Sequence, residues 1–151
     1  MIDPRLNRFD RLAPYYDVLA NLAFGGAISR SHKQNFHLIS NGATVLILGG
    51  GSGKWLRDFL NIHPSAKIYF IEASKKMLER AIGRSQNNQQ ITFIHGTEDD
   101  VPSIRFDVVI THFFLDMYSA DQLEKLIGKI RYLLERKGVW LVSDFEVVKT
   151  W

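Results

Sequence analysis

An aliphatic run that ends in a glycine-rich turn constrains this chain more than any other feature. Residues 45–48 are Val-Leu-Ile-Leu, and residues 49–53, Gly-Gly-Gly-Ser-Gly, follow directly. Apolar residues at helical spacing continue over 53–61, so the pattern predicts a strand, a tight turn and a helix. Glycine has no Cβ, and such a turn therefore lets a ligand approach the backbone closely. The function of the chain depends on which ligand this turn holds.

Length and composition indicate one domain that spans residues 1–151. The hydrophobic fraction is 46% and there is no cysteine, which excludes a disulfide framework and a thiolate metal site; no metal site is predicted. The net charge of +3 comes from scattered Lys and Arg residues, which is more typical of solvated faces than of a nucleic-acid interface. No apolar stretch approaches about 18 residues, and the first residues lack the apolar core of a signal peptide, so a cytoplasmic location is expected.

The first part of the chain has a helical pattern. Apolar residues recur at helical spacing over 9–24, interrupted by Pro14, and again over 27–40. We therefore expect residues 1–41 to form an N-terminal helical lid.

Strands and helices alternate over residues 42–151, which we expect to form an α/β core. The strand candidates are rich in Val, Ile, Leu and Phe on both faces, as strands covered on both sides should be. The predicted strands are 43–48, 67–72, 91–95, 106–111 and 138–143, and the predicted helices are 53–61, 74–84 and 119–135. This alternation predicts a doubly wound, Rossmann-like parallel sheet of about five strands, with little or no helix over 96–105.

Three ligand classes use a glycine turn after a strand, and the glycine spacing separates them. A phosphate loop in this frame would need glycine at Leu48 and a hydroxyl at Trp55. The dinucleotide pattern G-x-G-x-x-G would need its third glycine at Lys54 or Leu56. The pattern that remains is G-x-G-x-G at residues 49–53, which is also compatible with a purely structural tight turn.

Further motifs follow the glycine turn along the chain. Glu72 ends the second predicted strand about twenty residues after the turn, residues 106–109 are Phe-Asp-Val-Val, and Gly138 leads the last predicted strand. Together these motifs resemble the class I S-adenosylmethionine-dependent methyltransferases, and they are most similar to the small-molecule, quinone-biosynthesis-like branch. Residues 9–17 resemble the N-terminal lid of that branch. The resemblance also implies that the five strands of the sheet lie in the order 3-2-1-4-5.

The resemblance implies S-adenosyl-L-methionine as the cofactor and methyl transfer to a small-molecule acceptor as the reaction. The implied cofactor-binding residues are Gly49, Gly50, Gly51, Gly53, Glu72, Ala73, Thr97, Glu98, Thr111 and Tyr16. In this pattern the Glu72 carboxylate accepts hydrogen bonds from two ribose hydroxyls. His112 and Asp116 are candidate general bases. Residues 111–114, Thr-His-Phe-Phe, are not the Asn/Asp-Pro-Pro-Tyr motif of amino-methylating nucleic-acid enzymes, so a nucleic-acid substrate is not expected.

The chain departs from the family pattern in three places. Ile47 stands where the family usually has an acid, and Thr97 stands where it usually has Asp. Both changes remove negative charge from the site of a cationic ligand. The chain also reaches Trp151 before the C-terminal helix and hairpin of the family. Either the sequence is part of a longer protein, or the sheet edge beside the fourth and fifth predicted strands is open, which could support self-association.

Two alternatives from other functional classes stay open at the level of sequence. Ile47 and Thr97 are compatible with a methyltransferase-like binding or interaction module that does not catalyse a reaction. A nucleotide-cofactor oxidoreductase is disfavoured by the spacing of the glycines.

Overall fold

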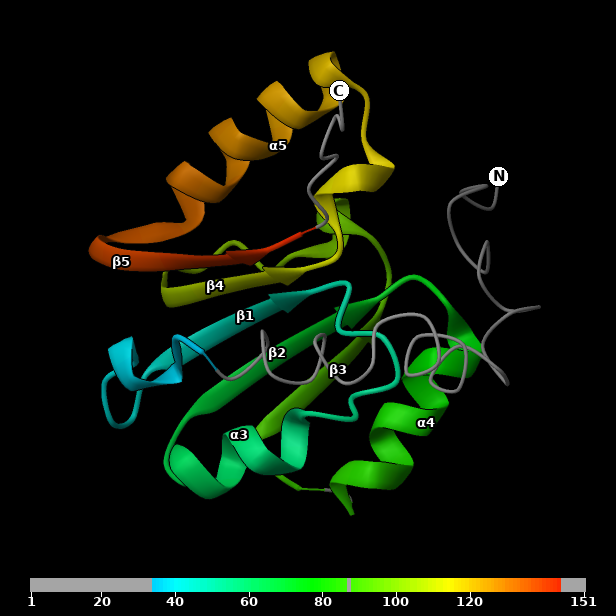
Figure 1. Cartoon of the computed structure of the whole chain (residues 1–151), viewed down its shortest axis with the longest axis vertical. Helices are drawn as coiled ribbons and strands as arrows, with labels where there is room; N and C mark the ends of the chain where they lie inside the picture. Colours follow the sequence, from blue (N-terminus) through cyan, green and yellow to red (C-terminus); the bar gives the residue numbers. More distant parts are fainter. Residues whose placement is uncertain (1–33, 87, 145–151) are drawn as a thin grey trace, which may run out of the picture.

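A parallel β-sheet organises the structure, a computed structural model that describes residues 34–86 and 88–144. The strands are β1 (Thr44–Leu48), β2 (Lys67–Glu72), β3 (Ile91–His95), β4 (Phe106–His112) and β5 (Leu134–Ser143). They lie in the order β3-β2-β1-β4-β5, and every neighbouring pair is parallel. The predicted doubly wound sheet and its strand order are therefore confirmed, with β1 at the centre (Figure 1).

Helices cover both faces of the sheet. The helices α3 (Leu56–Ile62) and α4 (Lys75–Ser85) lie on one face, and α5 (Ala120–Leu133) lies on the other (Figure 1). The described 3-10 turns are η1 (Phe36–Leu38), η2 (Glu98–Asp100) and η3 (Leu115–Met117). Because helices cover both faces of the central strands, β1 and β4 are buried almost throughout.

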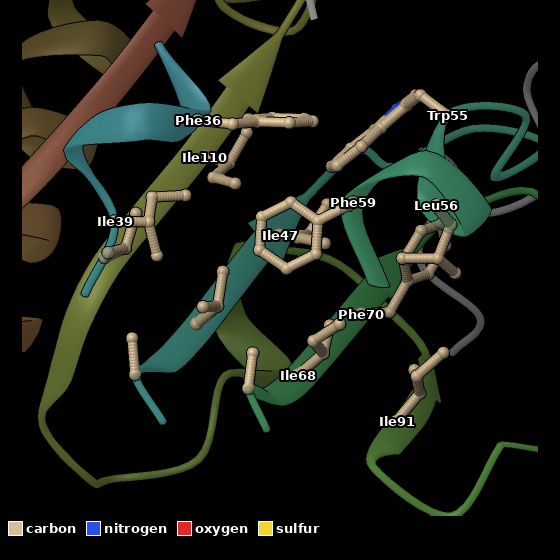
Figure 2. Close-up of a cluster of buried hydrophobic side chains, with 14 of the residues drawn as sticks. Phe36, Ile39, Ile47, Trp55, Leu56, Phe59, Ile68, Phe70, Ile91 and Ile110 are labelled. Atoms are coloured by element: carbon tan, nitrogen blue, oxygen red, sulfur yellow. The ribbon is translucent and has the colours of Figure 1, made fainter. Parts of the chain in front are cut away.

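The face covered by α3 and α4 holds an aromatic cluster. The centroid of the Phe59 ring lies 5.0 Å from that of Phe36 and 6.0 Å from that of Trp55. Both pairs meet edge-on, which is a favoured geometry for aromatic rings. Figure 2 shows these three rings together with Ile47 and Ile110 of the central strands. The cluster fixes η1 and the start of α3 against the middle of the sheet.

The opposite face packs against α5. Leu126, Ile130 and Leu133 recur at helical spacing along α5 and are buried. They form a second core with sheet residues that include Phe106 and Val109. Successive residues of a strand point to opposite faces, and for this reason each central strand contributes to both cores.

Two of the helix starts agree with the sequence signals. The predicted helix 53–61 instead begins at Leu56, because Gly53 has a φ of +64° and still belongs to the glycine turn. The Ser74 hydroxyl accepts a hydrogen bond from the Met77 N–H at 3.3 Å at the start of α4. Ser119 and Gln122 form a reciprocal capping box at the start of α5. The predicted lack of helix over 96–105 is confirmed, since the short turn η2 is the helical element described there.

The C-terminal end of the predicted helix 119–135 was wrong. The helix ends at Leu133, and β5 begins at Leu134 rather than at residue 138. The physical reason is Arg105, whose guanidinium donates hydrogen bonds to the backbone carbonyls of Tyr132 and Leu134. It satisfies carbonyls that a helix end leaves without partners, so the chain can turn into the sheet.

The predicted N-terminal lid is described only over residues 34–41. Within the predicted helix 27–40, the described residues form the turn η1 instead of a regular helix, because Phe36 and Ile39 pack into the first core. Tyr16 and the rest of the predicted lid lie outside the described residues. Across the described ranges, no helix combines the length and the apolar character that a membrane span requires.

Replacing Phe59 tests the aromatic cluster. Phe59 is fully buried, so Phe59→Ala is expected to lower the free energy of unfolding by about 3–5 kcal/mol through lost burial and a residual cavity. Ile62 of the same helix is 49% exposed, and Ile62→Ala should change that free energy by no more than about 0.5 kcal/mol. Urea denaturation followed by circular dichroism measures both values. Equal losses in the two variants would contradict the packing described above.

Candidate functional site

A cavity of about 250 Å³ opens at the C-terminal ends of β1, β2, β3 and β4, the edge at which open α/β sheets bind ligands. Its described lining is Leu48, Gly49, Gly51, Ile71, Glu72, Ala73, Met77, Gly96, Thr97, Glu98, Phe113, Phe114, Met117, Tyr118 and Gln122. The predicted cofactor-binding residues among them are Gly49, Gly51, Glu72, Ala73, Thr97 and Glu98. One cavity therefore brings together the glycine turn, the end of β2 and the segment after β3.

The glycine turn forms one wall of the cavity. Gly49 and Gly51 have φ values of +65° and +60°, a left-handed conformation that glycine adopts without steric cost. A Cβ at Gly49 would lie 2.4 Å from the Phe114 ring, whereas a Cβ at Gly51 would meet no atom within 4 Å. Gly49 thus allows close packing against Phe114, and Gly51 keeps the space beside the turn open.

Gly50 and Gly53 shape the turn but are not among the described lining residues. A Cβ at Gly50 would lie 2.2 Å from the Phe70 ring, and a Cβ at Gly53 would lie 2.8 Å from the Cβ of Ala81. These two glycines let the turn pack directly on β2 and α4.

Arg84 of α4 restrains the same turn. Its guanidinium donates to the Ser52 carbonyl oxygen at 2.9 Å and to the Ser52 Oγ at 2.5 Å. Ser52 lies between two glycines, where the backbone would otherwise have the greatest freedom. The contact therefore reduces the number of conformations open to the turn.

Glu72 joins the glycine turn to the start of α4. Its Oε2 accepts the Gly51 N–H and its Oε1 accepts the Ser74 N–H, both at 2.8 Å. Glu72 is only 7% exposed, and this burial raises the pKa of its carboxyl, while hydrogen bonds from the backbone N–H groups of Ser74, Gly51 and Ala73 oppose the rise. Each carboxylate oxygen can accept more than one hydrogen bond, so Glu72 keeps acceptor capacity for a ligand.

The segment after β3 supplies Thr97 and Glu98. The Thr97 hydroxyl accepts the Asp99 N–H at 3.3 Å, and the Asp100 carboxylate accepts the Thr97 N–H at 2.8 Å, so Thr97 caps the turn η2. The Oε2 of Glu98 accepts a hydrogen bond from the Tyr118 hydroxyl at 2.7 Å. This bond joins the lining segments that follow β3 and β4.

Thr111 and His112 end β4 but are not among the described lining residues. Thr111 is fully buried, and its Oγ1 accepts the indole N–H of Trp140 at 2.9 Å. The centroid of the His112 ring lies 5.4 Å from that of Trp55. Burial lowers the pKa of His112 to about 4, so the imidazole is neutral near pH 7.

Asp116 lies in η3 and is exposed. Partial desolvation and the nearby Asp144 carboxylate raise its pKa. Asp116 and His112 each adjoin a residue that lines the cavity, Met117 and Phe113 respectively. The structure does not bring either candidate base itself into the described lining.

Sequence reasoning missed three residues in the part of the wall that follows β4. Met117, Tyr118 and Gln122 line the cavity from the stretch between the end of η3 and the first turn of α5. Their only signal in the sequence is their position after a strand end, where ligands bind in this class of sheet. The contact of Tyr118 with Glu98 depends on the relative placement of β3 and β4, which are not neighbours in the sheet.

The buried His112 should make stability depend on pH. Its pKa is lowered from 6.5 to about 4 in the folded state, so the unfolded chain binds this proton more readily between those values. The contribution of neutral His112 to the free energy of unfolding is fully present above about pH 6.5. It is lost as the pH falls toward 4, by about 3 kcal/mol in total. Urea midpoints from pH 7 to 4 should fall less steeply in His112→Asn than in the wild type. Identical slopes would show that His112 is not a buried neutral histidine.

Comparison with protein families identifies one match. The family model described as "Methyltransferase domain" matches residues 45–138, which is more than half of the chain. The matched range includes the glycine turn, Glu72 and all of β4. No curated protein sequence matches the chain.

Solved structures show the same fold. The DhpI–SAH complex has a TM-score of 0.73 at 22% identity and covers 90% of this chain and 65% of that chain. A complex between the Haloferax volcanii Trm112 methyltransferase activator and a methyltransferase has a TM-score of 0.72 at 22% identity. The match covers 89% of this chain and 58% of that chain. A SAM-dependent methyltransferase from Thiobacillus denitrificans in complex with S-adenosyl-L-homocysteine has a TM-score of 0.58 at 26% identity. The match covers 71% of this chain and 44% of that chain. The chain thus spans less than two thirds of each of these proteins.

The family match, the strand order and the place of the cavity agree. The match begins at Val45 in β1 and runs through the glycine turn, and the cavity lies where that turn meets the ends of three other strands. The chain therefore belongs to the methyltransferase-domain family, which confirms its predicted relationship to the class I S-adenosylmethionine-dependent methyltransferases.

Proposed function

We propose that this domain binds S-adenosylmethionine in the described cavity and transfers its methyl group to a small-molecule acceptor. The observation that carries this proposal is the buried Glu72 carboxylate, which accepts the Gly51 N–H of the glycine turn at 2.8 Å. A ligand that lies against the open side of Gly51 also meets an acceptor for hydroxyl or amine donors.

The charges of the lining favour a cationic ligand without phosphate groups. Glu72 and Glu98 both line the cavity, and none of the lining residues in the described part of the chain is Lys or Arg. The phosphates of a dinucleotide would face two carboxylates without a basic partner, which like-charge repulsion disfavours. S-adenosylmethionine instead carries a sulfonium and an ammonium group, which these carboxylates attract.

Aromatic and apolar side chains support the same ligand. Met77, Phe113, Phe114 and Tyr118 line the cavity, and such side chains pack well against a flat base. Aromatic faces also attract a sulfonium through cation–π interaction. With the acceptor capacity of Glu72 toward ribose hydroxyls, the residues present fit an adenosyl cofactor.

The bound cofactor would supply a methyl group that is already activated for transfer. The contribution of this chain is then to hold that group in line with the acceptor and to exclude water. His112 and Asp116 stay candidates for removing a proton from the acceptor, because each adjoins a residue that lines the cavity.

The finer features of the proposal rest on the sequence resemblance. They are the small-molecule acceptor, the quinone-biosynthesis-like branch, and a lid over residues 1–41 with Tyr16 facing the cofactor. The cytoplasmic location is a separate expectation from the sequence. Association of two chains through the outer edge of β5 also stays a prediction.

A binding module without catalysis is less well supported. Ile47 is buried in the core under α3 and is not a lining residue, so the lack of an acid there leaves the described lining unchanged. Thr97 does line the cavity, and Glu98 beside it supplies a carboxylate. The two departures from the family pattern therefore leave the cavity negatively charged.

Calorimetric titration with S-adenosylmethionine tests the role of Glu72. We expect micromolar binding by the wild-type chain and at least tenfold weaker binding by Glu72→Gln, because hydrogen bonds to a charged acceptor contribute about 1.5–3 kcal/mol each. Glu79 is exposed on α4, so Glu79→Gln is the matched control and should bind as the wild type does. Unchanged affinity in Glu72→Gln, or tighter binding of NAD than of S-adenosylmethionine, would contradict the proposal.

A pair of glycine variants separates ligand contact from backbone strain. Gly51 and Gly42 have φ values of +60° and +73°, and a Cβ would meet no atom within 4 Å at either position. Gly51→Ala and Gly42→Ala should therefore lose similar stability, about 1 kcal/mol each. Only Gly51 lines the cavity, so only Gly51→Ala should weaken binding of S-adenosylhomocysteine, by at least tenfold. Equal affinities in the two variants would show that the ligand does not contact the turn.

A further inference from the structure

The backbone changes direction at the end of β4 and places two adjacent aromatic residues in the same cavity. Successive side chains of an extended strand point to opposite faces. Phe113 and Phe114 nevertheless both line the cavity. The reason is the backbone of Phe113, whose φ is +53°, in the left-handed region that residues other than glycine rarely adopt.

Contacts with the end of β5 hold this bend. The Phe113 N–H donates to the Ser143 carbonyl oxygen at 2.7 Å, and the Leu115 N–H donates to the Asp144 Oδ2 at 2.9 Å. Phe114, between these two bonds, is only 7% exposed. The bend is thus fixed by these two hydrogen bonds and by burial of Phe114, while Phe113 is half-buried and lines the cavity.

Gln86 provides a comparison within the same chain. Among the described residues, Gln86 and Phe113 are the non-glycine residues with positive φ, and both values are +53°. Gln86 is the C-cap of α4, a position where left-handed residues commonly end helices. Phe113 follows a strand, so helix termination does not account for its conformation. Strain of this kind persists in proteins mainly where a functional site requires it.

We propose that Phe113 is a specificity-determining residue, whose ring contacts the bound ligand and whose backbone strain is retained for that contact. The identity of the ligand, S-adenosylmethionine, rests on the proposed function. Glycine at position 113 would relieve the strain but would remove an aromatic surface that packs on a base or attracts a sulfonium. Phe113 thereby makes this wall selective for a flat or cationic group over an anionic one.

Alanine and glycine variants at both positions test this inference. Phe113→Ala and Phe113→Gly both lack the ring and differ only in the Cβ, so the difference between their melting temperatures measures the strain. Gln86→Ala and Gln86→Gly are the matched controls. At each position the glycine variant should melt above the alanine variant, by roughly 3–6 °C. Both Phe113 variants should bind S-adenosylhomocysteine at least about tenfold more weakly than the wild type. Both Gln86 variants should bind it with the wild-type affinity.

Three results would count against the inference. Wild-type affinity in the Phe113 variants would show that the ring does not contact the ligand. A Phe113→Gly variant that melts below Phe113→Ala would show that the backbone at this position is not strained. A wild-type chain that binds neither S-adenosylmethionine nor S-adenosylhomocysteine would overturn the proposed cofactor together with the ligand contact, and the melting comparison would still measure the strain at residue 113.

Discussion

The hydrogen bonds of the Glu72 carboxylate determine the shape of the site. Its two oxygens accept the N–H groups of Gly51 and Ser74, both at 2.8 Å. A buried carboxylate is costly unless its oxygens are hydrogen-bonded, so the glycine turn and the first residue before α4 must both lie within reach of it. One side chain at the end of β2 therefore fixes the turn after β1 and the start of α4. The cavity between them follows from that constraint.

Burial of the sheet on both faces decides where this site can lie. Ile47 packs under α3 and its neighbour Leu46 packs under α5, so neither face of the central strand is open to a ligand. The ends of the strands remain, and there the chain turns through glycine and short loops. Parallel strands bring these turns to one edge, which is why residues from four separate loops line one cavity.

Local patterns made much of the fold predictable. The aliphatic strands, the serine caps and the glycine turn each have a signal within a few residues, and the parallel sheet follows from the α/β alternation. The strand order was expected from the resemblance to the methyltransferase family. Contacts between distant segments were not predictable. Arg105 ends α5 through carbonyls nearly thirty residues further along the chain, and Tyr118 reaches Glu98 across the cavity. Thr111 also shows what the sequence could not predict. Its hydroxyl accepts the Trp140 indole N–H, and only the pairing of β4 with β5 brings that partner near.

The central claim is that the glycine turn and Glu72 together hold S-adenosylmethionine. Nuclear magnetic resonance of the ¹⁵N-labelled wild-type chain tests it most directly, because each backbone amide is observed separately during a titration. We predict saturable shifts of the Gly49, Gly51 and Ala73 amide signals, which lie in the cavity lining, with the Gly42 signal unmoved. Unmoved signals from Gly49, Gly51 and Ala73 at saturating S-adenosylmethionine, or equal shifts with NAD, would contradict the account.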